Sequence, residues 1–255
     1  MNDYLKLFPK SKLKAYTCFN NSSIYGYSSS ILKSGVCKYT RRGEYDKLEW
    51  CIIELALFNL SKDGRSIVTN MINRLKILLM EDISFTEISR IYNCIILLDK
   101  YDNNRDNYNL LINIVYLLKG ASRNRITSYM NNWWRYKHSD NDINKDIKLD
   151  KIFKYKKKND TNYLLILGEN LIHFIENKDE RIFSIIMKLI TIKTDQGIRY
   201  RRRDAIYLFY EIIEPYFNND IELKTIFNFS LKQMYNKNMK ERHYYAIWLG
   251  LLIWK

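Results

Sequence analysis

The sequence predicts an all-α fold built from antiparallel helical hairpins. The 255 residues include only 8 Gly and 2 Pro against 47% hydrophobic residues, which leaves little material for the many turns of a β protein. Apolar residues recur at intervals of three and four along most of the chain, as they do on the buried face of a helix. The polar stretches between these patterns are short, which is typical of helices that pack antiparallel.

The N-terminal 28 residues read as an irregular arm that leads into the first helix. Pro9 and the pair Asn20-Asn21 interrupt any periodic pattern there. A hydroxyl of one of the serines 28–30 can accept a hydrogen bond from a first-turn amide, so we expect a helix from Ser28 to Arg41. Residues 29–134 are expected to form a first helical half.

Two glycines divide the next stretch into helices. Gly43 and Gly64 each follow polar residues and precede an apolar run at helical spacing, which predicts helix, turn, helix, turn and helix. The two apolar stripes that should pack together comprise Leu48, Cys51, Ile52, Leu55 and Leu57 or Phe58, followed by Met71, Ile72, Leu75, Leu78 and Leu79.

Local signals then predict three more helices in the first half. Ser84 and Glu87 have the spacing of a capping box, so a helix is expected to start at Ser84 and to run to about Lys100. Two shorter helices are expected at 108–118 and 123–134, because Gly120 between them is a plausible helix stop.

The composition changes at residues 135–161, which are dense in charge and poor in core residues. We interpret them as a charged linker or exposed loop between two helical halves. Residues 162–255 form the second half, with helices expected near 164–177, 182–192, 199–213, 219–234 and 239–254. Aligning the two halves places their hairpins in the same phase, which is the signature of a HEAT-like stack.

The net charge of +14, from 42 basic and 28 acidic side chains, indicates a polyanionic partner. An AT-rich coding sequence would explain the excess of Asn, Ile, Lys and Tyr, but it does not explain the local clustering of Arg. Nucleic acid is the first expected partner and acidic proteins are the second.

Targeting and metal-binding signals are not found in the sequence. No run of 18 or more apolar residues occurs and the N-terminus lacks the apolar core of a signal peptide, so we expect no membrane contact and an intracellular, cytoplasmic or nuclear location. The four cysteines show no CxxC spacing and no neighbouring histidine, which favours free thiols in a reducing compartment and no metal site: Cys18, Cys37, Cys51 and Cys94.

Catalytic motifs are also absent. The sequence contains no GxxxxGK[ST], GxGxxG, HExxH or GxSxG pattern. The neighbouring carboxylates Glu81 and Asp82 point to different faces of a helix, which suits capping or salt bridging better than shared acid–base work. We therefore expect a protein that is not an enzyme and needs no cofactor.

Basic clusters supply the candidate nucleic-acid contacts. The sequence IRYRRRD places four arginines at the start of a helix, where they could hold phosphates or pair with acids inside the protein. The run from Lys154 to Lys158 is either a solvated flank or a phosphate contact. The full set of candidates is Arg199, Arg201, Arg202, Arg203, Lys154, Lys156, Lys157, Lys158, Arg123 and Arg125.

Residues 33–84 resemble a known helical domain. Lys33-Ser34, the turn Arg41-Arg42-Gly43 with an acid after it, Trp50, Arg74-Leu75 and Glu81-Asp82-Ile83 follow one another in this order. They resemble the oligomerisation domain, related to the clamp-loader collar, that follows the ATPase module in replication-associated AAA+ proteins, where the pattern runs roughly KSIRRG(D/S)xxDAALYW and then RRLxxxASEDIG. The spacing departs from that pattern at residues 36–40, and the ATPase module is missing.

The resemblance implies a clamp-loader-collar-like stack in which Arg41, Arg42, Trp50 and Arg74 contact other protein subunits, including further copies of the chain. The function expected first is that of a non-catalytic accessory or scaffold subunit in a nucleoprotein assembly of DNA replication or repair. Two alternatives are an RNA-associated HEAT-like scaffold in translation or transcription, and a viral structural protein located in a viral factory. DNA and RNA are both retained as partners.

Overall fold

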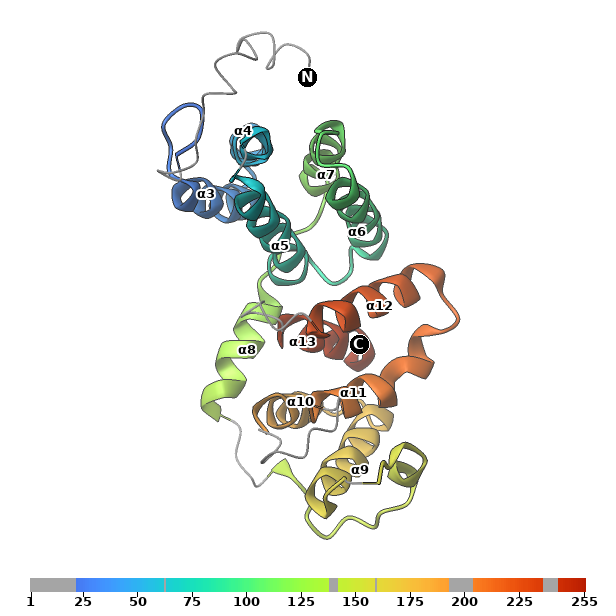
Figure 1. The fold of residues 1–255 in the computed structure, drawn as a ribbon. Coiled ribbons are helices and arrows are strands. Elements are labelled where there is room, and N and C mark those ends of the chain that lie inside the picture. The colour runs from blue at the N-terminus through green and yellow to red at the C-terminus, as the bar shows by residue number, and fades with distance from the viewer. Residues whose placement is uncertain (1–21, 62, 138–141, 159, 193–203, 236–242) are drawn as a thin grey trace. The chain divides into compact units, whose positions relative to one another are not determined.

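The computed structural model describes residues 22–61, 63–137, 142–158, 160–192, 204–235 and 243–255. Figure 1 shows that helices make up the fold. Within those ranges the only β pairing consists of two isolated bridges, Ser22 with Ser28 and Ile83 with Arg123. The all-α prediction is confirmed. None of the helices in this part of the chain is both long and apolar enough to cross a membrane.

The chain divides into two compact units, Met1–Asn124 and Arg125–Lys255. The division lies ten residues before the end of the predicted first half, so that residues 125–134 belong to the second unit. Each unit has its own buried apolar core.

Unit 1 consists of two helical hairpins and a long helix between them. Its helices are α3 (Ser29–Arg42), α4 (Tyr45–Ala56) continued by the 3-10 turn η2 (Leu57–Leu60), α5 (Arg65–Glu81), α6 (Ile88–Asn103) and α7 (Asn109–Lys119). The hairpins α3/α4 and α6/α7 are the most extensive pairings, and α5 packs against α3, α4 and α6. The two predicted apolar stripes are buried together in this core.

The ends of α3 follow the sequence signals closely. The Ser28 hydroxyl accepts a hydrogen bond from the backbone N–H of Ile31 at 3.3 Å, which caps the first turn. Gly43 ends the helix at φ 72°, a left-handed conformation that favours glycine, and its N–H donates to the carbonyl of Thr40 at 3.2 Å. The predicted stop at Gly120 is also confirmed, because α7 ends at Lys119.

The helix predicted to start at Ser84 instead starts at Ile88, so that prediction is wrong. The Ser84 hydroxyl lies 2.8 Å from the Thr86 hydroxyl, and the Glu87 carboxylate accepts a hydrogen bond from the backbone N–H of Ser122 at 3.0 Å. The side-chain amide of Asn124 also donates to the Ser84 hydroxyl at 3.0 Å, so both residues fix residues 82–87 to the segment after α7 instead of capping a helix. The tertiary contact has prevailed over the local motif.

Unit 2 is organised around its last helix. Its elements are α8 (Ile126–Lys137), the 3-10 turn η4 (Lys151–Tyr155), α9 (Asn162–Glu176), α10 (Ile182–Thr191), α11 (Ile206–Ile213) continued by η5 (Glu214–Phe217), α12 (Ile221–Tyr235) and α13 (His243–Trp254). Residues 244–251 of α13 are all buried, as expected for a helix that is apolar on every side. α13 packs against α8, α10, α11 and α12, so the first helix of this unit meets the last.

The charged segment is attached to this core. Residues 142–158 are its main described part, and they contain two buried side chains, Ile143 and Ile152. The Asn170 side chain accepts a hydrogen bond from the backbone N–H of Asn144 at 3.0 Å and donates one to its carbonyl at 2.9 Å. This part of the segment is therefore an ordered loop on α9.

Glu54 is a buried carboxyl that ties residues 22–28 to α4. Only 2% of the residue is exposed. Burial raises the pKa of Glu54, and hydrogen bonds from the Ser23 hydroxyl and the Tyr25 backbone N–H lower it by less. The folded protein therefore holds this proton more tightly than the unfolded chain does.

We expect the wild-type protein to gain stability relative to Glu54→Gln as the pH falls. Because the pKa is raised in the folded state, the charged carboxylate destabilises the fold above that pKa, and protonation relieves the penalty as the pH falls toward the ordinary glutamate value. Urea denaturation of both proteins at about pH 7 and about pH 5 measures the change. A difference in unfolding free energy that is the same at both pH values would contradict the expectation.

Candidate nucleic-acid interface

The basic run starts in the 3-10 turn η4 and continues directly after it, and a buried glutamate holds η4 in place. Glu169 of α9 is 6% exposed. Its carboxylate accepts hydrogen bonds from three consecutive backbone N–H groups, those of Asp150 at 3.0 Å, Lys151 at 3.3 Å and Ile152 at 2.9 Å. Consecutive N–H groups that converge in this way form an anion-binding concavity. Here the anion is the protein's own side chain, so the turn is fixed to α9.

The inner side of η4 is packed tightly. Ile152 has no exposed surface and lies against Gly168 of α9. A Cβ at Gly168 would overlap the Ile152 side chain and would also meet Leu208 of α11. Glycine at this position lets η4 lie directly on α9. Lys151 and Phe153, on either side of Ile152 in the sequence, are both exposed.

The outer side of the turn combines lysines with aromatic rings. We call residues 151–158 the basic turn. Lys154 Nζ lies 4.8 Å from the ring centroid of Tyr155, and Lys156 Nζ lies 5.6 Å from that of Phe153. Both distances allow a cation–π interaction. Phe153 is nevertheless 51% exposed, so a large apolar ring stands in water beside ammonium groups.

Four lysines of the basic turn are exposed and form no ion pair within the described ranges: Lys154, Lys156, Lys157 and Lys158. Lys151 behaves differently, since its Nζ pairs with Glu176 at 2.6 Å. Asp160, two residues after the turn, accepts a hydrogen bond from the backbone N–H of Lys157 at 2.8 Å. The turn therefore presents a local excess of positive charge to solvent.

Within the described residues, none of the remaining nucleic-acid candidates contacts the basic turn. Arg123, in unit 1, donates to the Thr40 carbonyl at 3.5 Å and lies over the ring of Tyr45 at 5.9 Å. Arg125, in unit 2, donates to the Ser128 hydroxyl at 3.0 Å. The other four candidates lie outside the described residues: Arg199, Arg201, Arg202 and Arg203.

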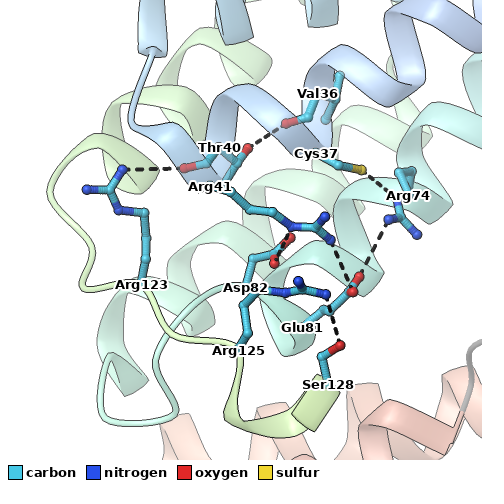
Figure 2. A network of polar contacts seen from close by, with 10 residues as sticks. All are labelled: Val36, Cys37, Thr40, Arg41, Arg74, Glu81, Asp82, Arg123, Arg125 and Ser128. Carbon is cyan, nitrogen blue, oxygen red and sulfur yellow. Dashed lines mark hydrogen bonds and ion pairs between the residues drawn. The ribbon is translucent and has the colours of Figure 1, made fainter. Parts of the chain in front are cut away.

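Figure 2 shows an ionic network inside unit 1. Arg41 of α3 donates from Nε to Asp82 at 2.8 Å and from Nη2 to Glu81 at 3.1 Å. Arg74 of α5 lies 3.5 Å from the second oxygen of Glu81, and its Nε donates to the Sγ of Cys37 at 2.7 Å. The acidic side chains are 1% (Asp82) and 7% (Glu81) exposed, so their charges are paired away from water.

The pKa values of Arg41 and Cys37 reflect the pairing in this network. Burial lowers the pKa of Arg41, but the hydrogen bond and charge of Asp82, together with the charge of Glu81, outweigh burial and raise it. Burial raises the pKa of the Cys37 thiol, and Arg74 opposes that shift. Both arginines are partly exposed, at 31% and 27% of their side chains, and their charges face the buried acids and the thiol.

The four residues that the family resemblance assigns to subunit contacts differ in their surroundings. Arg41 and Arg74 belong to the internal network. Arg42 is exposed and its Nη1 lies 4.0 Å from a carboxylate oxygen of Glu44. Trp50 is half-buried, with its ring 5.1 Å from that of Tyr27 in an edge-on arrangement.

Sequence reasoning missed the residues that build the basic turn. Glu169 and Gly168 lie in a helix whose sequence pattern is apolar. The residues next to them do not indicate a contact with a segment some 17 residues earlier. A lone acid inside an apolar helix is the signal that was available, since a buried charge requires partners.

Comparison with protein-family models, curated proteins and solved structures finds no match to the chain. The resemblance of residues 33–84 to the collar-like domain therefore stays a prediction.

Proposed function

We propose that this protein is a non-catalytic helical module of a nucleoprotein assembly, and that it binds nucleic acid through the basic turn. The observation that carries the proposal is the set of four exposed lysines held on a turn that is anchored to the core. Phosphate contacts require positive charges that are not already neutralised, and these lysines meet that condition.

Anchoring matters as much as charge. A flexible lysine tail would have to be ordered on binding, whereas Glu169 and Ile152 hold the basic turn before any ligand arrives. The net charge of +14 would add a long-range attraction for any polyanion. The proposal therefore combines general electrostatic attraction with one preformed contact surface.

The test is to replace Lys154, Lys156, Lys157 and Lys158 with glutamine and to measure binding of a labelled oligonucleotide by fluorescence anisotropy. Affinity near physiological salt should fall on the order of a hundredfold if all four lysines contact phosphate. The slope of log affinity against log salt should fall by about 3, because each lost contact to a single strand removes roughly 0.7.

A matched control removes the same charge elsewhere. Lys38, Lys100, Lys119 and Lys232 are exposed and lie on four different helices, so their replacement by glutamine lowers the net charge equally without touching the basic turn. The control should retain most of the affinity. Equal losses in both variants would show that binding depends on net charge alone, and the assignment of the basic turn would be wrong.

A further inference from the structure

Three aromatic rings accompany the lysines of the basic turn. Phe153 and Tyr155 belong to η4, which packs against α11, and Tyr216 belongs to η5, the continuation of α11. Phe153 and Tyr216 are 51% and 54% exposed. Burial raises the pKa of Tyr216, the charges of Glu176 and Tyr155 raise it further, and those of Lys154 and Lys151 oppose them.

Such rings offer a ligand more than apolar area. The face of an aromatic side chain can stack on a nucleobase of any sequence, while lysines beside it contact the phosphates on either side of that base. Lys154 already lies over Tyr155, and Lys156 over Phe153, so charge and ring are held a few ångströms apart. This is the pairing of groups that a strand with accessible bases would need.

We infer that the basic turn binds single-stranded nucleic acid, with unpaired bases stacking on Phe153 and Tyr216. The inference rests on the proposed function and specifies its ligand. In a duplex the base faces are covered by neighbouring bases, and opening a step costs about a few kcal/mol. A single strand presents those faces without that penalty, so the rings add affinity for it alone.

The experiment compares four labelled probes of equal length on the full chain: single-stranded DNA, single-stranded RNA of the same sequence, the DNA duplex, and an abasic single strand that carries phosphates without bases. Wild-type protein should bind one or both of the base-containing single strands at least about tenfold more tightly than the duplex and the abasic strand. Unlabelled polyglutamate is added as a competitor that has charge but neither sugar nor base.

Variants then locate the stacking. Phe153→Ala and Tyr216→Ala should each weaken binding of the single strand by roughly tenfold and leave binding of the abasic strand unchanged. Phe153→Trp and Tyr216→Phe keep a ring and should bind normally. Tyr116→Ala is the matched control, because Tyr116 is also exposed, at 75%, but lies on α7 of unit 1.

The outcomes separate the inference from the proposed function. Equal affinity for all four probes, with no effect of the ring variants but a clear effect of the lysine variant, would overturn the inference and leave nucleic-acid binding in place. No binding of any probe, or displacement by polyglutamate as effective as by the oligonucleotide itself, would overturn both.

Discussion

Replacing Glu169 with alanine is expected to destabilise the protein by about 3 kcal/mol and to weaken nucleic-acid binding by the basic turn. The substitution removes the acceptor of three backbone hydrogen bonds, and a buried donor left without a partner costs about 1–3 kcal/mol. Of the three, the bond from Ile152 is the one that is fully buried. The melting temperature should fall by roughly 6–12 °C for a chain of this size.

Glu176→Ala is the matched control for this prediction. It lies on the same helix, and its carboxylate pairs with Lys151, but both side chains are about half exposed. An exposed pair of this kind contributes about 0–1 kcal/mol, so stability should hardly change. The variant Glu169→Gln keeps one acceptor oxygen, so its melting temperature should lie between those of Glu169→Ala and Glu176→Ala. Equal melting temperatures for Glu169→Ala and Glu176→Ala would show that the buried carboxylate does not hold the turn.

Binding measurements test the role of Glu169 independently of its effect on stability. If Glu169 orders the basic turn, then Glu169→Ala should weaken oligonucleotide binding at a temperature where the variant is still folded, although the side chain cannot itself touch the ligand. Circular dichroism at that temperature establishes the folded state. Unchanged affinity in a folded variant would mean that the turn needs no anchoring to bind.

Local signals in the sequence predicted the elements of unit 1 well where they act alone. Ser28 and Gly43 specify the two ends of α3 through their own backbone and hydroxyl groups, without help from distant residues. Ser84 and Glu87 carry an equally strong local signal, yet they bond to Thr86 and to the segment after α7. A capping box can be recognised from sequence, but a competing partner some 35 residues away cannot.

The candidate interface was predictable in its charge but not in its construction. The basic run is visible as Lys154 to Lys158, and its exposure follows from its composition. The support from Glu169 and the close packing allowed by Gly168 both depend on contacts between separate elements of the fold. These contacts determine whether the run is a loose flank or a fixed surface, so the two readings could not be separated from the sequence.

Replacing Arg41 with methionine is expected to destabilise the protein by about 3–5 kcal/mol. Methionine keeps much of the side-chain length but removes the charge that faces Asp82 and Glu81. Breaking a buried ion pair from one side leaves the remaining charge less well compensated, although Arg74 still faces Glu81, and this is the main source of the loss. Arg41 is itself 31% exposed on its side chain, which places the expected value toward the lower end of that range.

Arg42→Met provides the control in the next position of the same helix. Arg42 is 64% exposed on its side chain and reaches Glu44 only at 4.0 Å, so its replacement should change the unfolding free energy by about 0.5 kcal/mol or less. Urea denaturation of both variants measures the contrast. If Arg41 instead serves mainly as a contact to another subunit, the ionic network contributes little to the fold of unit 1. Arg41→Met will then have the same unfolding free energy as Arg42→Met, and only Arg41→Met will change the oligomeric state.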